Sequence, residues 1–517
     1  RIVEAVSMQH VAEHPDVYLT AVHVGDADAD AEDYLLPLGF GDEEQLQLTD
    51  VRSASPIVAR LQVDRRGMRE TGALYDAFGD EAFSRALLEV IASRRVLQGW
   101  GGKLSGRQSR AFRRLQGPVS DRLEVIPLRA EQSDSEVLYG NRFILKLFRR
   151  LEEGINPDLE IGAYLTDQVA FAHIPPVAGA IEYRADRSQP ATMAVLRGFV
   201  ANEGNAWQFT LDSLSGYFER VFADATVAPP ETELPRLPLL TLSEGETPDA
   251  AKRWFGSYLE SAELLGRRTA ELHTALASET ENPSFSPERF SRLYQRSLYQ
   301  GLRNQAARSL QLLQRCLDLL PVETRASAED LLGRRPEVEE RLQAITRRGI
   351  SAVRMRNHGN YHLGQVLYTG SDFIIIDFEG EPARPISERQ IKMSPLRDVA
   401  GMLRSFDYAC HSALDDQFAN VVVPTEDYSL LDHWVRFWVT WTSAAFLRSY
   451  LAVSGEAPFV PKPHDAVQTL LDAYLLEKAF HELQYELNNR PDWAHIPLRG
   501  ILRLLETEPM TVGRLVR

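Results

Sequence analysis

The residues best suited to chemistry lie in one short stretch, where a polar turn is followed by a carboxylate after an apolar run. The turn opens with His358-Gly359-Asn360 and closes at Gln365, and Asp377 comes directly after the run 373–376. Four apolar, mostly β-branched residues in a row are typical of a buried strand. Amide and carboxylate oxygens are ligands that Mg²⁺ accepts together with phosphate oxygens. The stretch therefore predicts a phosphoryl-transfer site, with Gln365 and Asp377 as metal ligands and residue 360 facing the acceptor hydroxyl.

A basic residue must meet the phosphates in such a site, and Lys146 is the candidate. It lies inside the apolar run 143–148, where an unpaired ammonium group is costly. One interpretation is an edge-strand lysine whose head reaches solvent. The other is the strand lysine of a protein kinase, which binds nucleotide phosphates and pairs with a glutamate on a helix. Glu160 is the candidate partner, because Asn156-Pro157 is a start signal for a helix over 158–168.

A third group of polar residues lies on a helix predicted over 464–487. Lys478, His481 and Tyr485 are spaced i, i+3 and i+7, so they lie along one face. A cation, an imidazole and a phenol on one face could bind sugar hydroxyls, with the phenol ring as an apolar stacking surface. The same spacing also describes an ordinary solvated helix face, and both interpretations stay open.

Length and composition limit the class of protein. A chain of 517 residues is too long for one ordinary core, so two or three domains or lobes are expected. The net charge of −16 argues against nucleic acid or an anionic membrane as a partner. Two isolated cysteines, Cys316 and Cys410, fit a reducing cytoplasm. No apolar run approaches the roughly 20 residues that span a bilayer, and a start at Arg1 without a signal pattern suggests a piece of a longer protein.

The elements that position these residues change type near residue 200. Alternating or continuous apolar runs predict strands in the first part, and a helical period predicts a helix starting near Asp80. The strands are expected at 17–24, 34–40, 57–63, 122–128, 143–148, 180–183 and 192–199. The second part is helical over 249–348, with breaks at Pro321 and Pro336, and then from Pro395, over 430–454 and over 464–487. This order indicates an α+β fold.

Two further sites in the helical part have less specific patterns. Arg397-Asp398 stands at a predicted helix start, where the pair either braces the turn at 358–360 or forms an ordinary helix-start ion pair. His273 lies alone on a predicted helix and is interpreted as a packed or surface residue without a catalytic role.

Several separate motifs resemble bacterial maltokinase, and more narrowly the maltokinase module often fused behind a trehalose synthase. The motifs are H-G-N-Y-H-L-G-Q-V-L from His358, I-D-F-E-G-E-P-A-R-P from Ile376, S-P-L-R-D-V-A-G-M-L-R-S-F-D-Y-A from Ser394 and Y-E-L-N-N-R-P-D-W from Tyr485. The resemblance extends from about residue 90 to the C-terminus. It implies a bilobal, aminoglycoside-phosphotransferase-like kinase fold with an N-terminal α+β cap over 1–95, an N-lobe over 96–200 and a helical C-lobe over 201–517.

The resemblance also implies an activity and a set of site residues. That family transfers the γ-phosphate of ATP, with Mg²⁺, to the anomeric hydroxyl of maltose, and a trehalose synthase domain is an expected fused or associated partner. By the resemblance, Ser133 and Lys146 hold the phosphates, and backbone groups at Phe199 and Val200 hold the adenine. Lys478, Tyr485 and Arg499 match maltose-binding positions, whereas His481 stands where the family tends to have Tyr.

The clearest departure from the family pattern is Asn360. The family's loop reads H-G-D, and its Asp is the catalytic base; an amide keeps the shape but cannot accept a proton at neutral pH. We therefore expect binding of Mg-ATP with slow phosphorylation, whether Asn360 is natural or introduced. Two alternatives remain: a pseudokinase-like module that supports a fused trehalose synthase, and a related sugar kinase with another acceptor such as glucosamine. The presence of both Gln365 and Asp377 argues against the first alternative.

Overall fold

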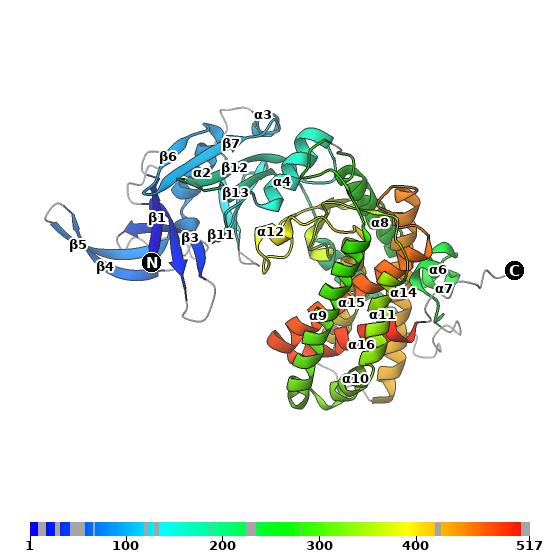
Figure 1. Cartoon of the computed structure of the whole chain (residues 1–517). Helices are drawn as coiled ribbons and strands as arrows, with labels where there is room; N and C mark the ends of the chain where they lie inside the picture. The colour runs from blue at the N-terminus through cyan, green and yellow to red at the C-terminus, as the bar shows by residue number, and fades with distance from the viewer. Residues whose placement is uncertain are drawn as a thin grey trace. The chain divides into compact units, whose positions relative to one another are not determined.

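The computed structural model describes residues 1–8, 17–25, 31–41, 57–65, 68–117, 123–128, 134–186, 188–223, 234–279, 281–418 and 425–507 (Figure 1). Helix makes up about 52% and strand about 23% of the chain, which confirms the mixed α and β composition predicted from the sequence. Contacts between residues divide the chain into two compact units: Arg1–Ala201 with Asp377–Gln390, and Asn202–Ile376 with Ile391–Arg517. The finer division at residues 95 and 200 stays a prediction.

The first unit is built on two antiparallel sheets, drawn in blue to cyan in Figure 1. The strand order is β1-β2-β3-β5-β4 in one sheet, with β11 also paired to β3, and β6-β7-β12-β13-β10-β9-β8 in the other. The strands are β1 Ile2–Ser7, β2 Val17–Val24, β3 Glu32–Gly41, β4 Ile57–Arg65, β5 Met68–Asp76, β6 Val96–Gln98, β7 Gly102–Gln108, β8 Val125–Leu128, β9 Ser135–Tyr139, β10 Phe143–Leu147, β11 Arg150–Leu151, β12 Val177–Ala185 and β13 Ala191–Gly198. The strands predicted from the sequence are confirmed; the one expected from 122 begins at Val125, and 122 itself lies outside the described residues.

One hydrophobic core joins the two sheets of this unit. Helix α2 (Glu81–Ala92) begins at Asp80, whose side chain accepts a hydrogen bond from the Ala82 N–H, as the sequence pattern predicts. Its apolar face, with Phe83 and Leu87 fully buried, packs with residues from strands of both sheets. The other helices of the unit are α3 (Phe112–Gln116), α4 (Pro157–Tyr164) and α12 (Ile386–Arg389).

Helix α4 starts as predicted but ends early. Asn156 caps it by accepting from the Asp158 N–H at 2.9 Å, and Pro157 occupies the first turn. The helix expected to continue to Gln168 instead ends at Tyr164 and is followed by one π turn, Leu165–Val169. The wider turn leads to Ala170, which has a left-handed backbone (φ 54°) and ends the segment.

The second unit is mainly helical (green to red in Figure 1). Its helices are α5 Ala206–Ala223, α6 Leu239–Glu244, α7 Asp249–Phe255, α8 Tyr258–Leu276, α9 Arg292–Cys316, α10 Val322–Gly333, α11 Arg335–Arg347, α13 Leu396–Phe418, α14 Thr425–Ser454, α15 Asp465–Asn489 and α16 His495–Glu506. Pro321 caps α10 and Pro336 lies in the first turn of α11, so both predicted breaks are helix starts. The short strand pairs are β14 Glu288–Arg289 with β15 Val353–Arg354, and β16 Val366–Tyr368 with β17 Phe373–Ile375.

Aromatic packing holds the helices of this unit together. The Trp254 and Trp434 rings lie 4.9 Å apart and connect α7 to α14, while Tyr258 of α8 lies 5.1 Å from Trp438 of α14. Gly266 of α8 lets α14 approach closely, because a Cβ there would overlap the Phe446 carbonyl. Among the described residues, no helix is both long and apolar enough to span a bilayer.

Candidate functional site

Lys146 occupies an interior strand of the seven-stranded sheet. In β10 it pairs across the ladder with Val195 of β13 on one side and Glu136 of β9 on the other. The residue is 4% exposed, so its ammonium group does not reach open solvent. The edge-strand interpretation is therefore wrong, and a buried, paired lysine is confirmed.

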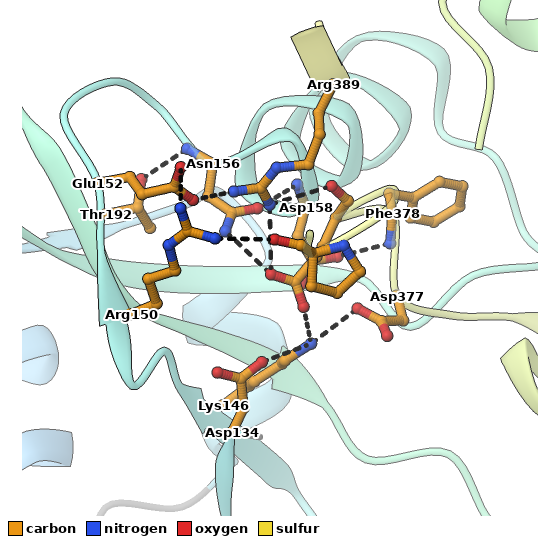
Figure 2. Close-up of polar contacts among 12 residues, drawn as sticks. Asp134, Lys146, Arg150, Glu152, Asn156, Asp158, Thr192, Asp377, Phe378 and Arg389 are labelled. Atoms are coloured by element: carbon orange, nitrogen blue, oxygen red, sulfur yellow. Dashed lines mark hydrogen bonds and ion pairs between the residues drawn. The ribbon is translucent and has the colours of Figure 1, made fainter. Parts of the chain in front are cut away.

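Three carboxylates surround the ammonium group of Lys146 (Figure 2). Its Nζ lies 2.7 Å from Glu379 Oε1, 2.8 Å from Asp377 Oδ1 and 3.3 Å from Asp134 Oδ2. We call these four residues the lysine cluster. Burial on its own would lower the pKa of Lys146, but the three carboxylates outweigh it and raise the pKa above its usual value. Burial raises the pKa of Glu379, Asp377 and Asp134 raise it further, and Lys146 opposes the rise.

The sequence predicted Glu160 as the partner of Lys146, and the structure corrects this prediction. Among the described residues, the carboxylates in contact with Lys146 Nζ are those of the lysine cluster, and Glu160 is not one of them. Asp158 on the same helix is fully buried, pairs with Arg197 and accepts a hydrogen bond from the Phe378 N–H at 2.9 Å.

Asp377 carries its carboxylate on a strained backbone. Its φ is +64°, a left-handed conformation that is uncommon for a residue other than glycine. Such conformations cost free energy and persist where the surrounding structure enforces them, often at functional sites. The short apolar strand before it, β17, ends at Ile375, so the predicted position of Asp377 just beyond a strand end is confirmed.

The charge of the lysine cluster fits a divalent cation. Three carboxylates face one ammonium group here, so acids outnumber bases within the lysine cluster, and the guanidinium group of Arg389 lies 3.5 Å from the far side of Glu379. In the described part of the chain, no group of three or more His, Cys, Asp or Glu side chains is arranged as a metal site by itself. The carboxylates converge on the lysine nitrogen instead, and a metal bound by Asp377 would need oxygen atoms of a ligand to complete its coordination.

In the second unit, the turn at 358–360 is held by a buried aspartate of α13. Asp398 accepts hydrogen bonds from the His358 N–H at 2.8 Å and the Gly359 N–H at 3.0 Å. Gly359 has a φ of +85°, which glycine adopts without strain. Gly401, one turn along α13, leaves room for the same loop, because a Cβ there would lie 2.5 Å from the Tyr361 carbonyl. The half-buried Asn360 is thus carried by a backbone that α13 holds in place.

His273 supports this aspartate from α8. Its side chain is fully buried, with Nε2 3.2 Å from Asp398 Oδ2 and Nδ1 3.0 Å from the Tyr450 hydroxyl. Burial by itself raises the pKa of Asp398, but His273 and the Gly359 N–H outweigh it and lower that pKa below its usual value. The interpretation of His273 as a packed residue is confirmed. Its contact with the loop-holding aspartate had no signal in the sequence.

The contacts of Arg397 decide between the two interpretations of the Arg397-Asp398 pair. Its Nη1 donates to the Gly359 carbonyl at 3.1 Å, and its Nε lies 3.3 Å from the Glu477 carboxylate of α15. The Arg397-Asp398 pair therefore braces the turn at 358–360 and is more than a helix-start ion pair. Because Gly359 precedes Asn360 and Glu477 precedes Lys478, one guanidinium group connects the predicted base position to the predicted acceptor helix.

Gln365 lies at the start of the β16–β17 hairpin, within a 3₁₀ turn over Leu363–Gln365. The residue is 3% exposed, and its carbonyl accepts from the Ile376 N–H at 3.0 Å. The hairpin predicted from the sequence is confirmed. Its role as a metal ligand stays a prediction.

The predicted acceptor residues lie on α15 and α16. Lys478 and His481 are half-buried and Tyr485 is exposed on one side of α15, while Arg499 of α16 lies 3.6 Å from Asp432 of α14. Every acidic residue of α15 is paired with an arginine: Asp465 with Arg348, Asp472 with Arg341, Glu477 with Arg397, Glu482 with Arg404 and Glu486 with Arg490.

Two of the remaining predicted nucleotide positions follow strand β13 of the seven-stranded sheet. Ser133 lies outside the described residues. Phe199 and Val200 follow the end of β13, and the Phe199 N–H donates to the Arg142 carbonyl at 2.8 Å. Their contact with adenine stays a prediction.

Comparison with known proteins points to one group of relatives. No family model matches the chain. The glucosamine kinase of Streptacidiphilus jiangxiensis is 22% identical over 385 residues, which cover 72% of this chain and 72% of the relative. The glucosamine kinase of Mycolicibacterium smegmatis is 22% identical over 383 residues, covering 74% and 79%.

Solved structures of glucosamine kinase resemble the chain over nearly its whole length. The complex with glucosamine, ADP and inorganic phosphate has a TM-score of 0.59 at 16% identity and covers 98% of this chain and 93% of its own. A second crystal form has a TM-score of 0.61 at 17% identity, with the same coverage. These likenesses show the fold, and the chain has the kinase-like fold of those structures, as its sequence predicted.

Proposed function

We propose that this protein is an ATP-dependent sugar kinase that transfers the γ-phosphate of ATP to the anomeric hydroxyl of maltose. The observation that carries the proposal is the bridge made by Arg397, which joins the turn at 358–360 to α15 within one unit. The kinase-like fold and the buried lysine cluster support it. Glucosamine kinases with this fold, one of them solved with ADP and glucosamine, support nucleotide use.

The first unit supplies the groups for the nucleotide phosphates. Lys146 is a preformed cation held by three carboxylates, and Asp377 is the carboxylate that the sequence pattern assigns to Mg²⁺, with Gln365 as the second ligand. Bound Mg²⁺ neutralises phosphate charge. Ser133 would add a hydroxyl to the phosphates, and the backbone at Phe199 and Val200 would hold the adenine.

Asn360 sets the rate in this proposal. Transfer forms a bond from the sugar oxygen to phosphorus while the bond from phosphorus to ADP breaks, and the hydroxyl proton passes to water because no carboxylate stands at position 360. An amide can orient that hydroxyl through its carbonyl oxygen, but it cannot take the proton. Positioning and charge neutralisation remain, so binding persists while turnover is slow.

The charges on α15 favour a neutral acceptor over an amino sugar. Recognition of an ammonium group requires a carboxylate that is not already neutralised, and all acidic residues of α15 have arginine partners. The groups on the predicted acceptor face are Lys478, His481 and Tyr485, which suit hydroxyl groups. Phosphorylation of glucosamine is the second candidate, favoured by the names of the relatives at 22% identity.

The test is turnover of the Asn360→Asp variant on a panel of sugars. We expect maltose phosphorylation to rise by about 10²–10⁴-fold over the parent chain, the usual contribution of a general base. An Asn357→Asp variant adds the same charge nearby and controls for it. Preference of the Asn360→Asp variant for glucosamine would establish the second candidate.

Calorimetry with Mg-ATP on the parent chain separates this proposal from the pseudokinase-like alternative. A kinase with a replaced base gives metal-dependent heat, whereas a scaffold without a nucleotide site gives none. An inactive Asn360→Asp variant that binds both ATP and maltose would contradict the role of residue 360.

A further inference from the structure

Glu379 makes the shortest contact with Lys146 in the lysine cluster, and both of its carboxylate oxygens are engaged. Its Oε1 lies 2.7 Å from Lys146 Nζ, and its Oε2 lies 3.4 Å from Asn156 Nδ2 and 3.5 Å from Arg389 Nη1. The side chain is 10% exposed. A buried carboxylate with cationic or N–H partners on both sides is held in one orientation.

The groups that hold Glu379 are themselves held by other side chains; two of them, Asn156 and Arg389, are labelled in Figure 2. Arg389 has a 3% exposed side chain, donates from Nη1 to the Glu379 carbonyl at 3.3 Å and pairs through Nη2 with Glu152. Asn156 caps α4, and its N–H donates to Thr192 Oγ1 at 3.0 Å. Glu379 is therefore anchored to α12 and to the start of α4.

In the proposed reaction Asp377 would divide its carboxylate between Lys146 and Mg²⁺, whereas Glu379 has no second role. The same carboxylate contacts Lys146 at 2.8 Å and is the predicted ligand of Mg²⁺. Once it turns to a metal, a lysine that is 4% exposed still requires a nearby negative charge. Asp134 lies farther away, at 3.3 Å.

We propose that Glu379 is the glutamate that keeps Lys146 in position for nucleotide phosphates, the role that the sequence pattern assigned to Glu160. This inference rests on the proposed kinase function. In protein kinases the glutamate partner of this lysine comes from a helix. Here it comes from the loop that carries Asp377, two residues earlier, so one tripeptide positions both the lysine and the metal ligand. Glu379 acts through Lys146 and is a positioning residue.

The pairing is tested first without nucleotide, by double-mutant cycles. Lys146→Met and Glu379→Gln are made singly and together, and urea unfolding is measured for all forms. We expect strong non-additivity, because each single change leaves one buried charge with fewer partners. The matched cycle of Lys146→Met with Glu160→Gln should be additive. The inference would be overturned if the unfolding free energies were additive for Lys146→Met with Glu379→Gln, or were coupled only for Lys146→Met with Glu160→Gln. Either result would decide the pairing whatever the protein's activity.

The role of Glu379 in nucleotide binding is tested by titrating ADP with and without Mg²⁺. Glu379→Gln should weaken Mg-ADP binding by about tenfold, because Asp377 must then serve both Lys146 and the metal. Maltose affinity should stay unchanged, a split that general damage to the fold would not produce. Glu160→Gln should bind as the parent does, and Glu379→Asp should restore part of the loss.

The outcomes separate the inference from the function on which it rests. If the parent chain binds no Mg-ADP, the proposed function fails, while the double-mutant cycle still decides the pairing. If the parent binds and Glu379→Gln binds equally well or more tightly, the inference fails. Should Glu379→Gln not fold, Arg389→Met acts through the same carboxylate and should weaken Mg-ADP binding in the same direction; an unchanged affinity would overturn the inference.

Discussion

Two buried clusters of charges, one in each unit, differ in their balance. In the first unit, the lysine cluster has three acids and one base. In the second unit, Arg404 and Arg503 are paired with Asp407 and Glu482, which we call the arginine cluster. Both clusters are buried, so both pay a desolvation cost, but only the arginine cluster is neutral.

The arginine cluster satisfies its acids with dedicated guanidinium groups. Arg404 donates to Asp407 at 2.6 Å and to Glu482 at 2.8 Å, and Arg503 donates to Asp407 at 3.1 Å. Although burial raises it, the pKa of Asp407 is lowered to about 2 by Arg404 and Arg503. Burial raises the pKa of Glu482 in the arginine cluster and the pKa of Glu379 in the lysine cluster, so the two clusters differ in their balance of charges and not in the direction of every pKa.

The comparison distinguishes a structural cluster from a functional one. A neutral network needs no further ligand, and it joins α13 to α15 and α16. An excess of buried acid around one lysine is unfavourable for the fold alone, and perturbed groups of this kind concentrate at functional sites. The surplus charge makes sense when a divalent cation and phosphates enter.

Removing a base from the arginine cluster should cause the largest change in the free energy of unfolding. Arg404→Met leaves Asp407 and Glu482 buried without their main partner, and we expect the free energy of unfolding to fall by about 3–5 kcal/mol. Urea unfolding measures the loss. Arg436→Met, which replaces another arginine of the same helical unit, is the matched control. An effect below about 1 kcal/mol would show that the cluster is not structural.

Replacing Asp398, which is held mainly by backbone N–H groups, should lower the free energy of unfolding by an intermediate amount. In Asp398→Asn one carboxylate oxygen becomes an NH₂ donor, so one of the His358 and Gly359 N–H groups loses its acceptor, and about 1–3 kcal/mol of stability should be lost. In the Asn360→Asp background, kcat should fall while Mg-ATP affinity stays unchanged. A reduced ATP affinity with unchanged kcat would contradict the loop-bracing role.

The pH dependence of the arginine cluster follows from Asp407. Its pKa is about 2 in the fold against the ordinary 3.8, so its contribution to stability is complete above about pH 4 and is lost as the pH falls through about 2. His411, whose pKa burial lowers to about 3, titrates in the same range. The difference in unfolding free energy between the parent and Asp407→Asn isolates the aspartate. That difference should shrink between pH 4 and pH 2; a constant difference would contradict the assigned partners.

Removing an acid from the lysine cluster should cause the smallest change in the free energy of unfolding. Asp134→Asn takes away one surplus charge and keeps the oxygen that accepts from the Arg149 N–H at 3.0 Å. We expect a change in unfolding free energy within about 1 kcal/mol, in either direction. Urea unfolding of this variant beside Arg404→Met gives the comparison directly. A loss as large as that of Arg404→Met would mean that the surplus acid is needed for the fold.

Much of the fold follows from local patterns. The strand at 143–147, the helix start at Asn156-Pro157 and the hairpin that ends before Asp377 are each specified by a few adjacent residues. The long helix from Asp465 to Asn489 follows from its apolar period. The π turn after Tyr164 did not, because its sequence still has helical propensity and the wider turn depends on tertiary contacts.

The sequence by itself determined which residues carry the chemistry: a lysine in an apolar strand, a carboxylate beyond a strand end, and an amide in a glycine turn. Only the tertiary structure decided their partners. It placed Glu379 rather than Glu160 beside Lys146, and it placed His273 behind Asp398. The physical reason is that a side chain's direction depends on the rotation of its element in the packed unit, and residues 233 positions apart come together only through folding.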